Sequence, residues 1–203
     1  MKKIAIFAFL LTAFAAAGRA QESRQDVSIS GIGLIEPYIS SSTDVQVSAN
    51  RALGGLVSYR FMMTPSSAIE ANYGMTYRNT IHYTIGNTNQ YKVNTRTQEI
   101  SFAYVRSFNY KRYNPFVEAG PGVFIFNPIR NSGTTTLNAK QQTSIGFLYG
   151  AGIAYEISPS FDIRAEYRGF ITKVPTFSDT TDSLQTNKWY NIYIPTVGVA
   201  YHF

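Results

Sequence analysis

Eight segments of this chain repeat a two-residue alternation, in which large apolar side chains are separated by small, polar or charged ones. Because successive side chains of a β-strand point to opposite faces, each segment predicts a strand with two unlike faces. Turn-forming residues bound every segment, which supports the same interpretation. The predicted strands cover residues 26–34, 51–63, 68–83, 97–108, 115–126, 144–157, 161–172 and 189–203.

The connections between the predicted strands alternate strictly in length. Short turns are predicted at residues 64–67, 109–114 and 158–160, and long polar loops at residues 36–50, 86–96, 129–142 and 173–188. Antiparallel strands joined in this rhythm place all the short turns at one end of the sheet and all the long loops at the other. The sequence therefore predicts an all-β fold, an eight-stranded antiparallel up-and-down barrel.

Two of the strands indicate which face points inward. In residues 144–157 one face carries Ile, Phe and Tyr side chains and the other is rich in glycine, and in residues 161–172 four charged side chains share one face. The charged pattern alone also fits a soluble barrel with an apolar interior. The glycines favour a transmembrane β-barrel, because an eight-stranded barrel has a crowded interior and its large apolar side chains then face lipid.

The predicted interior collects ionisable side chains from six strands. They are Arg60, Glu70, Arg78, Glu99, Glu118, Glu156, Asp162, Arg164, Glu166 and Arg168. Buried charges are tolerated when they are neutralised and hydrogen-bonded, so we expect a structural ion-pair network that fills the lumen. A polar path for small ions, and a proton relay or catalytic cluster, are the alternatives.

Three residues depart from the barrel pattern. Pro121 and Pro195 have no N–H to donate to the hydrogen-bond ladder, so we expect β-bulges at both positions. Arg106 falls on the lipid-facing side of its strand, and we expect it near a rim, where its long side chain reaches water.

Residues 1–20 predict a cleavable signal peptide. Lys2 and Lys3 precede an apolar run that ends at small residues around Ala20. With about 14 residues this run is too short to span a hydrocarbon core as a helix, so we predict cleavage after Ala20, with a retained membrane anchor as the alternative. Residues 21–203 then form the barrel domain. No later stretch is apolar for long enough to form a spanning helix.

Composition excludes several kinds of site. Removal of the signal peptide lowers the net charge from +6 to +3, because 15 basic and 12 acidic residues remain, and we find no basic run that predicts nucleic-acid binding. The chain has no cysteine, and its two histidines, His82 and His202, fall near opposite ends of the predicted barrel. We therefore expect neither a metal site nor a cofactor.

The predicted signal peptide, the eight alternating strands, the charged lumen and the terminal Tyr201-His202-Phe203 resemble the small outer-membrane β-barrel domain family, the OmpA/OmpX-like group. The resemblance implies the bacterial outer membrane as location, outer-membrane lipids and lipopolysaccharide as surroundings, and a monomer. It also implies that the barrel-assembly machinery reads Val197, Val199, Tyr201 and Phe203. The chain ends at the barrel, so we expect no peptidoglycan-binding domain and no tether to the cell wall.

Three functions agree with this architecture. The leading hypothesis is a non-enzymatic outer-membrane protein with a structural or surface-interaction role, carried by polar extracellular loops. The second is a narrow channel or small-solute uptake barrel. The third is a lipid-modifying enzyme, which is disfavoured because such an enzyme needs a histidine beside a serine and an acid, and His82 has no serine near it in the sequence.

Overall fold

The computed structural model describes residues 24–40, 45–85, 89–108, 110–129, 140–175, 177 and 188–203. The predicted signal peptide and its cleavage site lie outside the described residues. Across the described ranges, no helix is long and apolar enough to cross a membrane.

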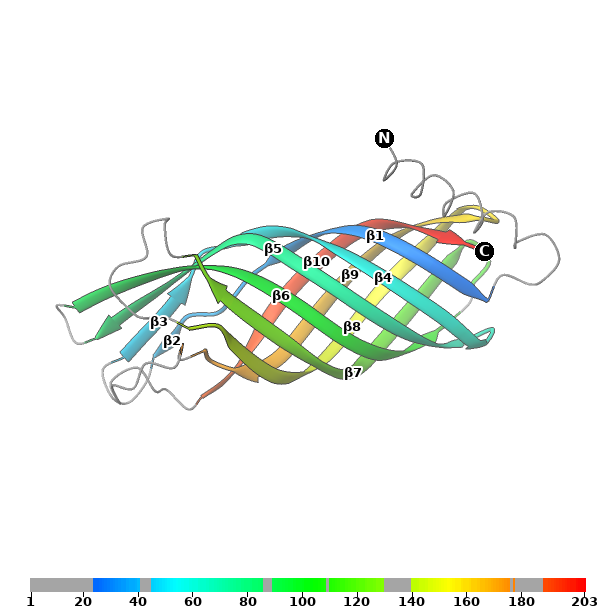
Figure 1. Ribbon diagram of the computed structural model, residues 1–203. Coiled ribbons are helices and arrows are strands. Elements are labelled where there is room, and N and C mark those ends of the chain that lie inside the picture. Colours follow the sequence, from blue (N-terminus) through cyan, green and yellow to red (C-terminus); the bar gives the residue numbers. More distant parts are fainter. Residues whose placement is uncertain are drawn as a thin grey trace, which may run out of the picture.

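Ten strands form one antiparallel sheet in the described residues (Figure 1). They are β1 (Gln25–Leu34), β2 (Ile39–Ser40), β3 (Val45–Ala49), β4 (Ala52–Thr64), β5 (Ser67–Ile85), β6 (Asn89–Ser107), β7 (Tyr113–Pro128), β8 (Gln142–Ser158), β9 (Phe161–Lys173) and β10 (Trp189–His202). The eight strands other than β2 and β3 each pair with two others of the eight, and the ring closes because β1 pairs with both β4 and β10. The sheet is therefore a closed eight-stranded barrel, which confirms the predicted fold.

The two ends of the barrel differ. At one end, here the turn end, β4 meets β5, β6 meets β7 and β8 meets β9 through short connections, and β1 begins beside the end of β10. The opposite end, here the loop end, carries the longer connections, except that residues 86–88 alone join β5 to β6. Figure 1 shows β5 and β6 running beyond the other strands at the loop end, with β2 and β3 beside them.

Two predicted loops contain strands. Residues 89–96 were expected in a loop, but the β5–β6 ladder continues through His82↔Lys92 to Ile85↔Asn89. The prediction was wrong because Val93, which the ladder turns inward, is fully buried against the apolar core and so has a partner that the sequence alone does not reveal. Similarly, β2 and β3 lie within predicted loop 36–50, and β3 extends the sheet by pairing with β5.

The faces of the strands agree with the crowded interior that the glycines predict. The outward side chains of β8, from Ile145 to Ile157, are exposed. On the inward face, a β-carbon at Gly150 would lie 2.8 Å from the Glu118 carboxylate, and one at Gly152 would lie 2.6 Å from the Phe116 ring. Glycine at these positions lets opposing side chains meet in a narrow lumen.

The expectation of bulges at the two prolines was wrong. Pro121 lies opposite Phe147 of β8 and Pro195 opposite Tyr167 of β9, both within unbroken registers. On its other side each proline falls in a gap of the ladder, and the same register resumes beyond it. The missing N–H donor of each proline therefore interrupts the ladder locally, but the strand contains no extra residue of the kind that makes a β-bulge. The register shifts lie elsewhere, at Met62/Thr64, Thr76/Asn79 and Glu156/Ser158.

Candidate functional site

An apolar cluster fills the lumen nearest the loop end. Phe126, Leu148, Phe170, Ile192 and Ile194 have no solvent exposure. Their neighbours include Leu34, Leu56, Phe124 and Tyr190 inside the barrel, and Tyr83 and Phe177 above it. The prediction that large apolar side chains face lipid did not include these inward rings. The available signal was Phe170, which continues the inward alternation of Arg164 and Arg168.

Arg168 is the centre of the next level of the lumen, where it is fully buried. Its Nη2 lies 2.9 Å from Glu99 Oε1, and its Nε lies 3.0 Å from Glu118 Oε1 and 3.5 Å from Glu166 Oε1. Glu99 and Glu118 belong to β6 and β7, so one guanidinium on β9 ties these strands together across the interior. Three carboxylates around one cation form a compact polar plug beneath the apolar cluster.

Arg60 and Glu70 form a second buried pair, from β4 and β5. Arg60 Nη2 lies 2.6 Å from Glu70 Oε2, and both side chains are nearly inaccessible to solvent. The Arg60 guanidinium carbon also lies 4.8 Å from the centre of the Phe116 ring, a cation–π contact.

A third group of charges closes the barrel at the turn end. Arg164 donates two hydrogen bonds to Asp26, of 2.9 and 2.7 Å. His202 Nε2 lies 2.8 Å from Asp162 Oδ2, and its Nδ1 lies 3.8 Å from Asp26. Asp26 was missed as an interior residue, although it faces inward in β1 directly opposite His202. These contacts join the first strand of the barrel to the last two.

The structure places nine of the ten predicted ionisable residues in the lumen and excludes one. Those inside are Arg60, Glu70, Glu99, Glu118, Glu156, Asp162, Arg164, Glu166 and Arg168. The prediction for Arg78 was wrong, because its side chain is exposed on the outside. The register shift between Thr76 and Asn79 breaks the strict alternation, so Tyr77 and Arg78 both point outward.

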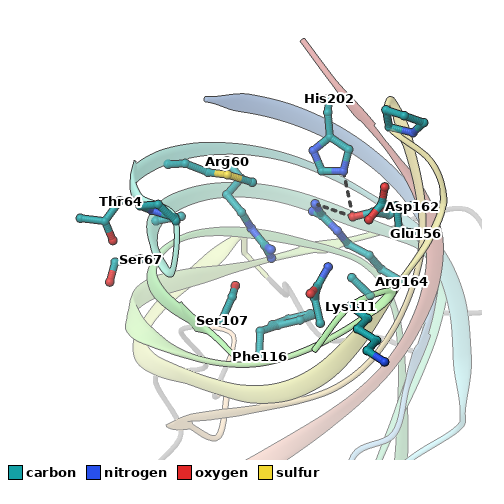
Figure 2. A pocket seen from close by; sticks show the side chains of 16 residues that line it. Arg60, Thr64, Ser67, Ser107, Lys111, Phe116, Glu156, Asp162, Arg164 and His202 are labelled. Carbon is teal, nitrogen blue, oxygen red and sulfur yellow. Dashed lines mark ion pairs between the residues drawn. The ribbon is translucent and has the colours of Figure 1, made fainter. Parts of the chain in front are cut away.

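A vestibule of about 410 Å³ lies at the turn end and is lined in part by these ion pairs. Its lining includes Lys111 in the β6–β7 turn and Glu156 at the end of β8. Figure 2 shows Arg164, Asp162 and His202 on one side of the vestibule and Arg60 reaching in from the other. The acid and base groups are mostly paired with each other, so the vestibule offers a mixed, nearly neutral surface.

The histidines lie far apart, as the sequence indicates. His82 pairs with Lys92 in the projecting part of β5, whereas His202 lies at the turn end. In the residues that the structure describes, no group of three or more His, Cys, Asp or Glu side chains is arranged to hold a metal ion.

A closed up-and-down barrel with an apolar outer wall and an ion-paired lumen is the architecture of a transmembrane β-barrel of the bacterial outer membrane. The chain belongs to the outer membrane protein beta-barrel domain family, whose model matches residues 5–203. This membership confirms the resemblance to small outer-membrane barrels and the location in the bacterial outer membrane.

Several solved structures share this fold. The Neisserial surface protein A is 15% identical over 89% of this chain and 98% of its own, with a TM-score of 0.60. The outer membrane protein OprG from Pseudomonas aeruginosa is 12% identical over 91% and 98%, with a TM-score of 0.62. The N-terminal β-barrel domain of Pseudomonas aeruginosa OprF is 18% identical over 90% and 100%, with a TM-score of 0.50. No curated protein matches the chain.

β10 and the adjoining Phe203 supply the four residues expected to direct assembly. Val197, Val199 and Tyr201 are exposed on the outer wall of β10. The Phe203 ring is partly buried and stacks 6.0 Å from Tyr201, and its backbone N–H donates to Gln25 O. Recognition of these residues by the assembly machinery stays a prediction.

Proposed function

We propose that this protein is a non-enzymatic, non-conducting outer-membrane barrel that presents its loop end to the surroundings of the cell. In barrels of this class the short turns face the periplasm and the long loops face outward. The observation that carries the proposal is the filled lumen, in which the apolar cluster and the Arg168 plug lie one above the other.

The interior supports a barrel that does not conduct. The inward faces of the adjacent strands β8 and β9 contribute side chains that meet inside the lumen. Three of them, Phe170, Leu148 and Arg168, have no exposed surface. An ion would have to displace both an apolar layer and a set of buried ion pairs, which costs the pairing of each charge.

The loop end supports a surface role. β2, β3, β5 and β6 form a small sheet that projects beyond the barrel (Figure 1). Its base is held by the apolar cluster and by the Tyr83 hydroxyl, which donates to Pro175 O over 2.8 Å. A sheet anchored in this way is a stable platform for contacts outside the cell.

Conductance in planar bilayers tests the proposal. The refolded protein is expected to give no unitary current, because the plug is complete. The matched variant combines Leu148→Gly and Phe170→Gly in the apolar layer with Arg168→Ala in the plug, and it should raise conductance because it removes fully buried side chains from both layers. A stable unitary current from the unaltered protein that changes with Arg164→Gln or Glu166→Gln would instead favour the channel alternative.

Lipid chemistry tests the enzymatic alternative. Lipid A profiles of cells with the unaltered protein and with His82→Ala are expected to be identical. A modification that appears with the protein and disappears with His82→Ala would overturn the non-enzymatic part of the proposal.

A further inference from the structure

Charge is segregated between the inside and the outside of the barrel. In the described residues, seven of the eight acidic side chains lie in the lumen, and the eighth, Glu36, is partly buried at the loop end. Three arginines lie inside, and every other described cation is exposed on the wall or the rims: Arg24, Arg51, Arg78, Lys92, Arg96, Arg106, Lys111, Arg112, Lys140, Lys173 and Lys188. The exposed charged side chains in the part of the chain that the structure describes are therefore all cationic.

Two of these cations lie over exposed aromatic rings near the loop end. The Arg96 guanidinium is 5.7 Å from the centre of the Tyr77 ring, and Arg78 is exposed beside Tyr77. Lys173 Nζ is 5.7 Å from the centre of the Trp189 ring, and the two residues are paired across β9 and β10. Tyr77 and Trp189 are 64% and 59% exposed, which leaves both pairs open to the surroundings.

The position of both pairs is the outer edge of the membrane. Tyr77 is the eleventh residue of β5, and Lys173 is the thirteenth of β9, counted from the turn end. A tilted strand crosses the hydrocarbon core with about 9–11 residues, and aromatic rings gather at the interface. Each cation–aromatic pair thus reaches the level of the lipid headgroups.

The same polar arrangement recurs just below each pair. Two residues along β6 from Arg96, Gln98 Nε2 donates to the Tyr73 hydroxyl over 3.1 Å. Two residues along β10 from Trp189, Asn191 Nδ2 donates to the Tyr149 hydroxyl over 2.7 Å. Each amide and hydroxyl therefore has a polar partner on an otherwise apolar wall. Both kinds of group can also hydrogen-bond to sugar hydroxyls.

We propose that these two clusters bind the phosphorylated sugar headgroup of the glycolipid of the outer leaflet, lipopolysaccharide. The first cluster comprises Tyr73, Tyr77, Arg78, Arg96 and Gln98, and the second comprises Tyr149, Lys173, Trp189 and Asn191. The cations pair with the phosphates, and the amide and tyrosine groups meet the sugars. The inference rests on the orientation in the proposed function, with the loop end outside.

The distribution of the clusters favours lipid over a protein partner. One cluster lies on β5 and β6 and the other on β8, β9 and β10, so they are separated by β7 on one side and by β1 and β4 on the other. A single docked protein would not reach both, whereas lipid surrounds the barrel. Arginine also suits phosphate, because its planar guanidinium donates two parallel hydrogen bonds.

Trp189 is the only tryptophan of the chain, so its fluorescence reports on the second cluster. The full chain, refolded in phosphatidylcholine vesicles, is titrated with lipid A that carries both phosphates. A saturable change in Trp189 fluorescence is expected. Lys173→Gln should weaken the apparent affinity about fivefold, since one cation near a charged lipid surface contributes roughly that factor. Lys173→Arg should retain it.

The first cluster is tested by the amount of bound lipid A. Arg78→Gln with Arg96→Gln should remove about half of the lipid A that copurifies, without altering the Trp189 titration. The control Arg24→Gln with Arg112→Gln changes two exposed cations near the turn end and should alter neither readout. All variants are compared as folded, heat-modifiable barrels, so a folding defect is visible separately.

Four outcomes would overturn the inference. The first two are equal binding of dephosphorylated lipid A and an equal response when phosphatidylglycerol replaces lipid A. The other two are competition by millimolar inorganic phosphate and a titration of Lys173→Gln that matches the unaltered protein. None of them bears on the filled lumen, which the conductance measurement tests independently.

Discussion

At the scale of single residues, the burial of Arg168 makes it the most consequential charge in the barrel. Its guanidinium faces Glu99, Glu118 and Glu166, and the lumen gives these carboxylates little access to water. Removing one partner from a buried network leaves the others uncompensated, which costs more than the network contributes as a whole.

Arg168→Met is therefore expected to lower the free energy of unfolding by roughly 3–5 kcal/mol. The measurement is a urea titration in lipid vesicles, followed by the gel shift between folded and unfolded chain. Lys140→Met, which removes an exposed cation at the loop end, is the control and should change stability by less than about 0.5 kcal/mol. Similar effects of the two variants would contradict the role of Arg168 as a plug.

Glu36 lies outside the membrane-spanning strands, and its ionisation makes the free energy of unfolding depend on pH. Burial raises the pKa of its carboxyl from 4.5 to about 7, although Asn79 donates a hydrogen bond that acts in the opposite direction. The folded protein therefore holds a proton that the unfolded chain has lost. The stabilisation that the protonated Glu36 carboxyl contributes is full below pH 4.5 and disappears as pH rises to about 7.

Glu36→Gln mimics the protonated form and should remove this dependence. Between pH 5 and pH 8, the unaltered protein should lose up to about 3 kcal/mol relative to the variant. The measurement is the difference between their urea titrations at the two pH values, since groups common to both proteins cancel. A constant difference across the pH range would show that Glu36 ionises normally.

At the scale of the strand, the facing of β10 can be tested through its outer wall. Val197 is 62% exposed and lies between Gly31 of β1 and Ala165 of β9, so no large neighbour shields it. Val197→Arg should destabilise the barrel by about 2–4 kcal/mol near mid-bilayer, whereas Val197→Leu should be nearly neutral. Refolding titrations in vesicles measure both, and equal stability would place this face away from lipid.

The strands and their faces were predictable because alternation is a local property of the sequence. The charged face of β9 and the apolar face of β8 could be assigned from single segments. The position of Arg78 could not, because the shift at Thr76/Asn79 depends on how β5 pairs with β6. Likewise, the interior role of Asp26 depends on Arg164, which is 138 residues away in the chain. Contacts across the lumen join residues that are far apart in the chain, so the sequence of one strand does not reveal which side chains lie opposite it.

At the scale of the whole molecule, closure and orientation act together. The β1–β10 ladder closes the sheet, and the bidentate Arg164–Asp26 pair spans β10 from inside to hold the same seam. A sealed barrel of this kind offers proteases its rims alone. Lys140 and Lys188 are exposed at the loop end, whereas Lys111 and Arg112 are exposed at the turn end.

Trypsin added to intact cells should therefore cut after Lys140 or Lys188 and spare the bond between Lys111 and Arg112. After the outer membrane is opened by osmotic shock, cleavage at Lys111 and Arg112 should appear as well. Mass spectrometry of the fragments separates the two patterns. Cleavage at Lys111 in intact cells would show that the barrel has the opposite orientation in the membrane. Both cationic clusters would then lie beside the periplasmic leaflet, where no lipopolysaccharide is available to them.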